Sequence, residues 1–361
     1  MKPPVHFAAL ALVLTAAASC SPPDTGRPDL EAAAFLQLVA AEDARPAGGP
    51  ALETLVAGTH HPRATLRAAA VRGLGRLERP AALDPITPLL YDADAGVRRE
   101  AANAAAQAVH RGSGAAALGP LLARVDHEDV PSVRAAVARS LGRLRLDAPD
   151  RRRVAAALEA LSHGPDNGFS PADQLVGVAL GAESLMRSLG GEPRPPALQA
   201  RLREMAAYGR GAGDDSPTAR RIRTVALLAY AGPGLTAQEV ATFLEDPERA
   251  VRRVAAARLG TVDAPERSAL EVRALGDPSP QVRLEAVRSL GTSPLDGDAC
   301  RRLRVAAVDP DTGVRITALD ALARPCPDGP ATRDLLEGTA RGLPAGVDAA
   351  WHTAAHALVA L

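Results

Sequence analysis

The chain has 361 residues, of which 42 are basic, 42 are acidic, 47% are hydrophobic and only 2% are aromatic. The balanced charge argues against binding to nucleic acid or to a membrane surface through bulk electrostatics. Alanine, leucine, valine and arginine dominate, and this composition favours helices while giving few large side chains for a single globular core.

The first nineteen residues are typical of an export signal. Lys2 precedes a largely apolar, uncharged run at 7–18, and these twelve residues are too short to cross a bilayer as a helix. Small residues then lead directly to Cys20. This arrangement resembles a bacterial lipoprotein signal peptide, which is cleaved before a cysteine that becomes lipid-modified. An ordinary secretory signal with an incidental cysteine is the alternative.

The resemblance to lipoproteins implies a location as well as a processing step. Residues 1–19 would be the signal peptide, Cys20 the lipidated first residue, and 20–28 a short tether. Several acyl chains on one residue hold a protein stably on a membrane. Ser21 next to the cysteine resembles lipoproteins sent to the outer membrane. We therefore expect an exported, lipid-anchored protein of the bacterial cell envelope, at the outer membrane and facing the periplasm.

After this tether, apolar residues recur at helical spacing. Leu30, Ala33, Ala34 and Leu38 share one face of a helix expected over 29–44.

A longer motif then recurs along the chain. In its clearest copy, Val282, Ala286 and Leu290 share one helix face and Gly291 suits the helix end. Related copies begin at Leu66, Val97, Val133, Ile222, Val251 and Val314. A second helical segment separates successive copies, so the unit is a helix pair of roughly thirty residues that stacks on its neighbours.

This motif resembles the HEAT repeat family, in particular the short HEAT-like repeats of bilin lyases. The resemblance implies an all-α fold over 29–361, an α-solenoid in which stacked helix pairs form a right-handed superhelix. In the family pattern an aspartate stands six residues before the arginine of the second helix. The resemblance implies that these pairs form a ladder, in which each arginine reaches aspartate or backbone carbonyls between adjacent repeats. The matching pairs here are Asp92 and Arg98, Asp246 and Arg252, Asp277 and Arg283, and Asp309 and Arg315. His61 and Glu128 stand where two other copies would have aspartate, so we expect the ladder to lapse there.

The middle of the chain is irregular. Val133 and Ile222 lie 89 residues apart, with one candidate helix at 171–189 between Gly/Pro-rich stretches. These stretches of the region 162–217, at 162–171, 190–196 and 209–217, are interpreted as long loops or as a change in superhelix curvature. Such loops either carry a binding surface or are tolerated insertions.

No catalytic or metal-binding motif stands out. A di-iron hydroxylase of HEAT-like fold relies on repeated His-Glu pairs, whereas only His127-Glu128 occurs here. His352 and His356 are one helical turn apart but have no evident third ligand for zinc. We expect no enzymatic activity, metal or cofactor. The alternative is a HEAT-like enzyme or metal- or cofactor-binding protein, similar to the lyases or the hydroxylase.

Two cysteines remain after Cys20. Cys300 and Cys326 stand near the starts of the first helices of two consecutive repeats, and equivalent points of neighbouring repeats stack side by side. Outside the cytoplasm such a pair can oxidise, so we predict a disulfide between them.

A stack of repeats offers a long surface more readily than a pocket, which suits an extended protein or peptide. We therefore expect a non-catalytic scaffold that binds a protein or peptide partner and no nucleic acid. Its concave helix face or the irregular middle would bind this partner, and the lipid would fix it to the membrane.

Overall fold

The computed structural model describes most of the chain, namely residues 30–165, 168–232, 235–292, 295–342 and 350–361. The predicted signal peptide and tether, with Cys20, lie outside these residues. In the described part the backbone is helical apart from loops and one isolated bridge between His163 and Phe169, which confirms the all-α class. Among these residues no helix combines the length and the apolar character needed to cross a bilayer.

One row of helices runs through the whole described chain, and each member packs against the next. This inner row consists of α1 (Leu30–Asp43), α3 (Ala64–Arg76), α5 (Ala95–Ala108), α7 (Pro131–Gly142), α9 (Ala172–Ser188), α11 (Pro217–Tyr230), α13 (Arg249–Ala256), α15 (Pro280–Thr292), α17 (Thr312–Leu322) and α19 (Ala350–Ala360).

A second, outer row alternates with the inner one along the chain. It consists of α2 (Pro50–Gly58), α4 (Leu83–Ile86) with the 3₁₀ turns η1 (Pro80–Ala82) and η2 (Thr87–Tyr91), α6 (Ala115–Val125), α8 (Ala148–Ser162), α10 (Pro196–Met205), α12 (Ala237–Phe243), α14 (Ala264–Leu275), α16 (Gly297–Ala306) and α18 (Gly329–Arg341). A further 3₁₀ turn, η4 (Leu259–Thr261), precedes α14.

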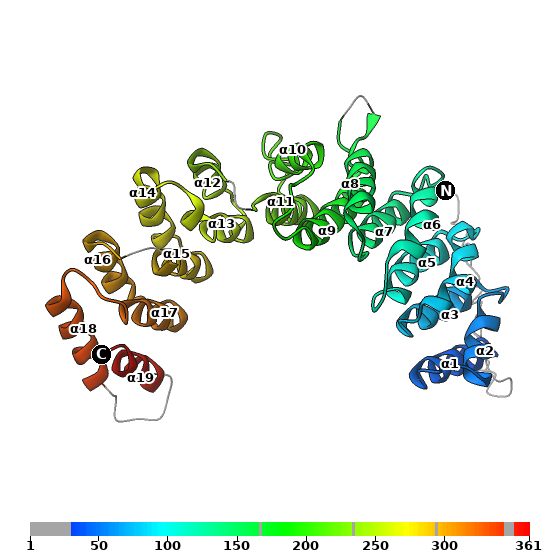
Figure 1. Ribbon diagram of the computed structural model, residues 1–361, viewed down its shortest axis with the longest axis horizontal. Coiled ribbons are helices and arrows are strands. Elements are labelled where there is room, and N and C mark those ends of the chain that lie inside the picture. The colour runs from blue at the N-terminus through cyan, green and yellow to red at the C-terminus, as the bar shows by residue number, and fades with distance from the viewer. Residues whose placement is uncertain (1–29, 166–167, 233–234, 293–294, 343–349) are drawn as a thin grey trace, which may run out of the picture.

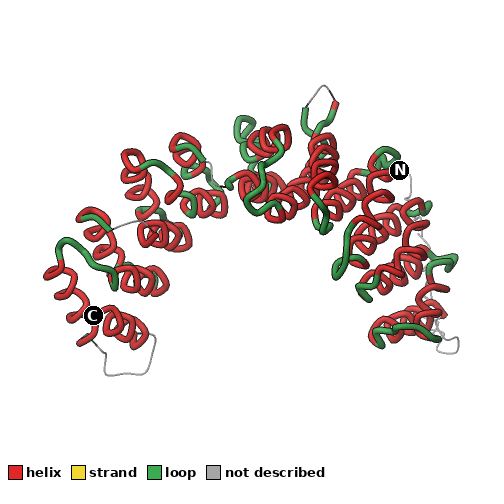
Figure 2. Tube along the Cα trace, viewed as in Figure 1, coloured by secondary structure: helices red, strands yellow, loops and turns green. Residues whose placement is uncertain are grey.

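The two rows build an open arch. Figure 1 shows α1 and α19 near its two ends, with the inner row on the concave side and the outer row on the convex side. The same view coloured by secondary structure shows helices joined by loops, with longer loops before α9 and α11 (Figure 2). The expected α-solenoid of stacked helix pairs is therefore confirmed.

The recurring apolar positions form the core between the rows. In α15, Val282 and Ala286 are fully buried and Leu290 is nearly so. Val314 and Ala318 of α17 are buried in the same way. The buried residues form two clusters, one from Leu38 to Ala286 and one from Val287 to Ala357, and this layered core explains how a chain with few aromatic residues can form an extended fold.

The irregular middle continues this arrangement. Helix α9 spans Ala172–Ser188, within one residue of the candidate helix at either end, and α8 and α10 supply outer-row neighbours. The candidate helix is therefore confirmed, α10 adds a second helix within 162–217, and most of the Gly/Pro-rich stretches at 162–171, 190–196 and 209–217 lie in the loops between the helices.

Glycines let α7 and α9 approach more closely than side chains would allow. A Cβ atom added to Gly142 would lie 1.9 Å from the carbonyl oxygen of Gly181. One added to Gly177 would lie 2.3 Å from the oxygen of Ala135, and one added to Gly181 would lie 2.3 Å from that of Ala138. Neither helix can accept a side chain at these points without moving. The centre of the arch is therefore a direct contact between two helix backbones.

Candidate functional site

The arginine of each repeat motif connects its own repeat to the next one. Nε and Nη2 of Arg283 each donate to the Asp309 carboxylate at 2.8 Å, while Nη1 donates to the Asp277 carbonyl oxygen at 2.9 Å. The Asp277 carboxylate instead accepts from Arg252, at 2.7 and 3.2 Å. The ladder is present, and each arginine reaches aspartate or backbone carbonyls between adjacent repeats as expected; Arg283 pairs with Asp277 through the Asp277 carbonyl. That aspartate supplies its carbonyl, and the carboxylate comes from the following repeat.

The ladder also continues where we expected it to lapse. Arg67 donates to the Asp92 carboxylate at 2.7 and 2.8 Å and to the carbonyl oxygen of His61 at 2.9 Å. Arg98 donates to both carboxylate oxygens of Glu128, at 2.8 and 2.9 Å. Any residue can provide the carbonyl at position 61, and glutamate reaches as well as aspartate at position 128. The expected lapse at His61 was therefore wrong. At Glu128 the expectation holds in part, because Glu128 replaces aspartate as the partner of Arg98 whereas Arg134, six residues after it, has no carboxylate partner among the described residues.

Glu128 is the most strongly held carboxylate of the ladder. Desolvation alone would raise its pKa, but hydrogen bonds from Arg98, the Val130 amide and Arg124 together lower the pKa to about 2. This carboxylate is thus ionised and fully engaged with arginines. Across the described ranges no group of three or more histidine, cysteine, aspartate or glutamate side chains could hold a metal ion.

The ladder is interrupted at the centre of the arch. Nη1 of Arg134 donates to the Glu128 carbonyl oxygen at 3.0 Å, but its Nε is buried without a hydrogen-bond partner. This gap coincides with the glycine contact between α7 and α9. At the far end Arg315 bonds the carbonyls of Asp309 and Pro310 and the Thr312 hydroxyl, with no carboxylate partner in the described residues.

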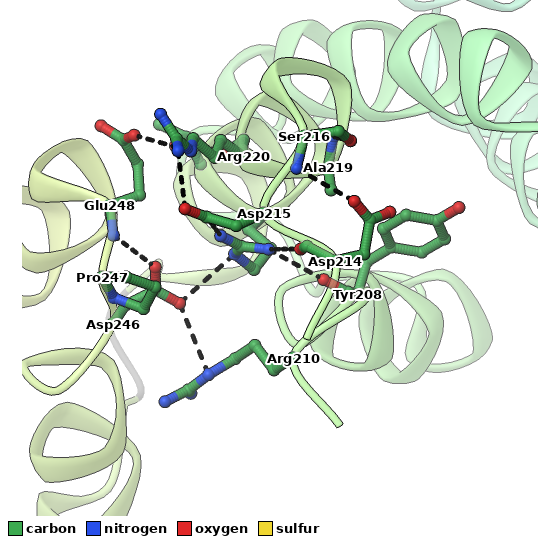
Figure 3. A network of polar contacts seen from close by, with 12 residues as sticks. Tyr208, Arg210, Asp214, Asp215, Ser216, Ala219, Arg220, Asp246, Pro247 and Glu248 are labelled. Atoms are coloured by element: carbon green, nitrogen blue, oxygen red, sulfur yellow. Dashed lines mark hydrogen bonds and ion pairs between the residues drawn. The ribbon is translucent and has the colours of Figure 1, made fainter. Parts of the chain in front are cut away.

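Beyond the gap the ladder resumes in a buried network around Arg223 of α11 (Figure 3). The Arg223 side chain is 1% exposed, and its Nε lies 3.3 Å from Oδ2 of Asp246. Its terminal nitrogens donate to the carbonyl oxygens of Tyr208 and Asp214 and to the carboxylate of Asp215. The loop between α10 and α11 is thereby fixed to the turn before α13.

The loop between α8 and α9 is also anchored. Arg201 of α10 donates to the Ser162 hydroxyl at 2.9 Å and to the Gly168 carbonyl oxygen at 2.8 Å. Its guanidinium carbon lies 4.1 Å from the centroid of the Phe169 ring, in a cation–π contact. The two loops that flank α9 and α10 are therefore held by buried arginines, which gives them a structural role.

Other side chains of the inner helices lie away from the ladder. Five residues along a helix correspond to 500°, or 140° beyond a full turn, which places a residue on a different face from the ladder arginine. The residues five positions after a ladder arginine are Arg72, Asn103, Arg139, Leu228, Ala257, Arg288 and Asp320.

Two grooves on the concave surface adjoin at Arg99. One, of about 270 Å³, is lined by α1, α3 and α5 and includes Arg72. The other, of about 200 Å³, is lined by α5, α7, α9 and α11 and includes Arg139 and Arg221. We call these four arginines the arginine groove. The sequence does not predict this groove by itself, although the five-residue offset from Arg67 to Arg72 and from Arg134 to Arg139 is visible in it.

Three carboxylates, Asp94, Glu100 and Asp173, also line the two grooves, so the four arginines there are incompletely neutralised. Arg99 lies 3.8 Å from Glu100, and Arg139 donates to the Asn103 side chain at 2.9 Å. Arg72 and Arg221 have no ion-pair or hydrogen-bond partner among the described side chains. The groove therefore offers cationic donors to a ligand.

The two later cysteines lie together. Cys300, fully buried in α16, is joined by a disulfide to Cys326 in the loop before α18, with an S–S distance of 2.05 Å and a Cα–Cα distance of 6.0 Å. The bond links two consecutive outer helices. The histidines near the chain end are not arranged as a metal site, because His356 Nδ1 lies 2.5 Å from the Asp320 carboxylate and His352 stacks on Trp351.

Comparison with known families now identifies the repeats. The family model described as HEAT repeats matches residues 52–142 and 268–355. These two segments are HEAT repeats. The HEAT segments flank residues 143–267, which contain Gly177 and Gly181 of the glycine contact and the Arg223 network, while Arg134 at the ladder gap lies just before them. The unmatched centre keeps the helix pairs but replaces part of the motif.

Solved structures agree with this fold. A chain in the structure of Kap95p with RanGDP is 15% identical with a TM-score of 0.50, covering 91% of this chain and 48% of that one. YibA of Escherichia coli is 18% identical with a TM-score of 0.48, covering 77% and 91%. An engineered protein is 18% identical with a TM-score of 0.47, covering 86% and 88%. At these identities the likeness concerns the fold alone. No curated protein matches the sequence.

Proposed function

We propose that the protein is a non-catalytic scaffold whose HEAT repeats bind a protein or peptide partner on the concave surface. A lipid on Cys20 holds it in the bacterial cell envelope, at the outer membrane and facing the periplasm. The arginine groove carries the proposal, because it gathers cationic donors that the ladder does not use.

The ladder explains why the other arginines are poor candidates for ligand binding. Most ladder arginines donate hydrogen bonds to a carboxylate and to carbonyl oxygens of the chain itself, as at Arg67, Arg98, Arg252 and Arg283. Freeing any of them would leave a buried carboxylate uncompensated. Binding of a partner to the arginines of the groove would not leave a buried carboxylate without its ion pair, so these arginines are available to a partner.

The shape of the groove favours an extended acidic segment. Packed helices lie about 8–10 Å apart, so the path from Arg72 on α3 to Arg221 on α11 is about 35 Å long. An extended chain rises about 3.3 Å per residue, so about ten residues would follow this path. Carboxylates on such a segment would accept paired hydrogen bonds from the guanidinium groups. Kap95p, a solenoid of this fold, is known in a complex with RanGDP, another protein.

Site-specific photocrosslinking in the native envelope tests this proposal. A photoreactive residue would replace Arg72 or Arg139 on the concave side, and a matched one would replace Arg152, an exposed arginine of α8 on the convex side. We expect a discrete protein adduct from the two concave positions and none from Arg152. Equal adducts from both faces, or none from the concave one, would contradict the proposal. Stoichiometric iron or zinc in the purified protein would favour the metal-dependent alternative.

A further inference from the structure

A second cationic feature lies outside the arginine groove, where α5, α7 and α9 end. It is a hollow of about 890 Å³. Five cationic or potentially cationic side chains line it together with the hydroxyls of Ser113, Ser184 and Ser188. We call it the basic hollow, and its basic residues are His110, Arg143, Arg145, Arg151 and Arg187.

Backbone contacts fix its walls. The Gly114 amide donates to the Arg145 carbonyl oxygen at 2.9 Å, so the turn after α5 rests directly on the turn after α7. A Cβ on Gly114 would lie 2.8 Å from that of Leu144, which shows how tightly these turns pack. Nη1 of Arg151 bonds the Leu146 carbonyl oxygen at 2.5 Å. The hollow is therefore part of the folded scaffold.

The basic hollow has more positively charged side chains than carboxylates to neutralise them. Arg151 pairs with Glu192 and Arg187 with Glu183, but neither carboxylate lines the hollow. Arg145 has no side-chain partner in the described chain, and Arg143 has only a 3.4 Å contact to the Ser140 hydroxyl. No aspartate or glutamate is among the lining residues.

The pKa of Arg143 is a further sign of this excess of positive charge. Desolvation lowers the pKa of its guanidinium, and the nearby charge of Arg139 lowers it further. A bound anion would relieve both effects, because it supplies an opposite charge and hydrogen-bond acceptors at once.

We propose that the basic hollow binds a phosphate-bearing anion through Arg143, Arg145 and the Ser113 hydroxyl. Planar guanidinium groups match phosphate oxygens in paired hydrogen bonds, and the Ser113 hydroxyl adds a neutral donor. The hydroxyls of Ser184 and Ser188 donate to the carbonyl oxygens of Leu180 and Leu185 instead. A volume of about 890 Å³ falls within the range of small-molecule sites, roughly 300–1,000 Å³. It exceeds what a single phosphate fills, which favours a diphosphate compound or a phospholipid head group. The site is separate from the arginine groove and does not depend on the proposed scaffold function.

Titration calorimetry with pyrophosphate as the probe tests the proposal. We expect Arg143→Gln/Arg145→Gln to weaken pyrophosphate binding by about tenfold or more. The control Arg253→Gln/Arg333→Gln removes the same charge from exposed positions of α13 and α18 and should leave the affinity within about twofold. Both double variants should retain the helical content of the original protein, since neither pair bonds a core group.

Vesicle binding separates the two sources of phosphate. Protein with Cys20→Ala would be sedimented with phosphatidylcholine vesicles that contain or lack phosphatidylglycerol. Binding to the anionic vesicles that Arg143→Gln/Arg145→Gln abolishes identifies a lipid head group. Pyrophosphate binding without vesicle binding identifies a free phosphate compound. The proposal is overturned if neither probe binds, or if the double variant binds as the original protein does.

Discussion

Arg283 and Asp309 belong to successive HEAT repeats and are joined by two hydrogen bonds of 2.8 Å, from Nε and Nη2 to the two carboxylate oxygens. The side chains are 13% and 11% exposed, so the pair is largely withdrawn from water. The same arginine bonds the carbonyl of Asp277 before its own helix. One side chain thereby ties a helix start to the next repeat.

This relationship predicts that replacing two neighbouring ladder arginines, Arg283 and Arg315, lowers the stability of the fold by different amounts. Arg283→Met removes a carboxylate partner and leaves Asp309 largely buried, whereas Arg315→Met removes only carbonyl and hydroxyl contacts. We expect Arg283→Met to lower the free energy of unfolding by about 2 kcal/mol more than Arg315→Met. Urea unfolding followed by fluorescence of Trp351, the only tryptophan, reports on these C-terminal repeats. Equal losses would show that the carboxylate pairing adds little.

The lowered pKa of Glu128 predicts a loss of stability in acid. The folded protein holds this carboxylate ionised down to about pH 2, whereas in the unfolded chain its pKa is near 4.5. Its contribution is therefore complete above about pH 4.5 and disappears as the pH falls toward 2. The shift corresponds to about 3 kcal/mol.

The comparison that checks this uses Glu128→Gln. At neutral pH the variant should unfold more readily than the original protein, and the difference should shrink as the pH falls from 6 to about 3. Urea titrations at several pH values measure it. A difference that stays constant over this range would argue against the assigned role of the carboxylate.

The glycine contact predicts that one added methyl group distorts the centre of the arch. In Gly181→Ala the new Cβ would lie 2.3 Å from the Ala138 carbonyl oxygen, so α7 and α9 must separate. We expect a loss of about 2 kcal/mol or more. Gly119→Ala in α6 is the control, because nothing lies within 4 Å of its Cβ. That change should raise stability by up to about 1 kcal/mol, since alanine favours a helix. Thermal unfolding measures both, and similar behaviour of the two variants would contradict the contact.

The disulfide predicts a redox-dependent stability. Cys300 and Cys326 are 26 residues apart in the sequence. A disulfide that closes a loop of this length should stabilise the folded state by roughly 3 kcal/mol. In the absence of reductant, Cys300→Ser should have a free energy of unfolding lower by this amount. Adding reductant should destabilise the original protein but leave the variant unchanged. Thiol counting on denatured, unreduced protein checks the bond directly, and two free thiols from this pair after oxidative maturation would sink the prediction.

Lipidation of Cys20 is tested by labelling. Palmitate should be incorporated into the original protein, and Cys20→Ala should abolish both the label and the membrane association. A variant that stays labelled and membrane-bound would defeat the anchor.

Much of the fold can be predicted from periodicity, because apolar residues recur in each copy of the motif at the positions of Val282, Ala286 and Leu290. These positions mark the buried face of the helix. The partner of Arg283 does not follow, since spacing within one repeat does not show which acidic group of the next repeat stacks beside it. Helix α9 obscures the pattern because glycines replace the larger residues where it meets α7. The arginine groove was missed for another reason: exposed residues have no burial pattern, and their common face emerges only once the inner helices stand side by side.

The central claim is that the arginine groove binds the partner, and affinity capture from the native envelope tests it most directly. One variant would change Arg72, Arg99, Arg139 and Arg221 to Gln. The other would change exposed arginines of the outer helices to Gln, namely Arg152, Arg203, Arg301 and Arg333. The account predicts that the original protein and the outer variant capture the same protein partner and that the groove variant loses it. Equal capture by the groove variant would contradict the account.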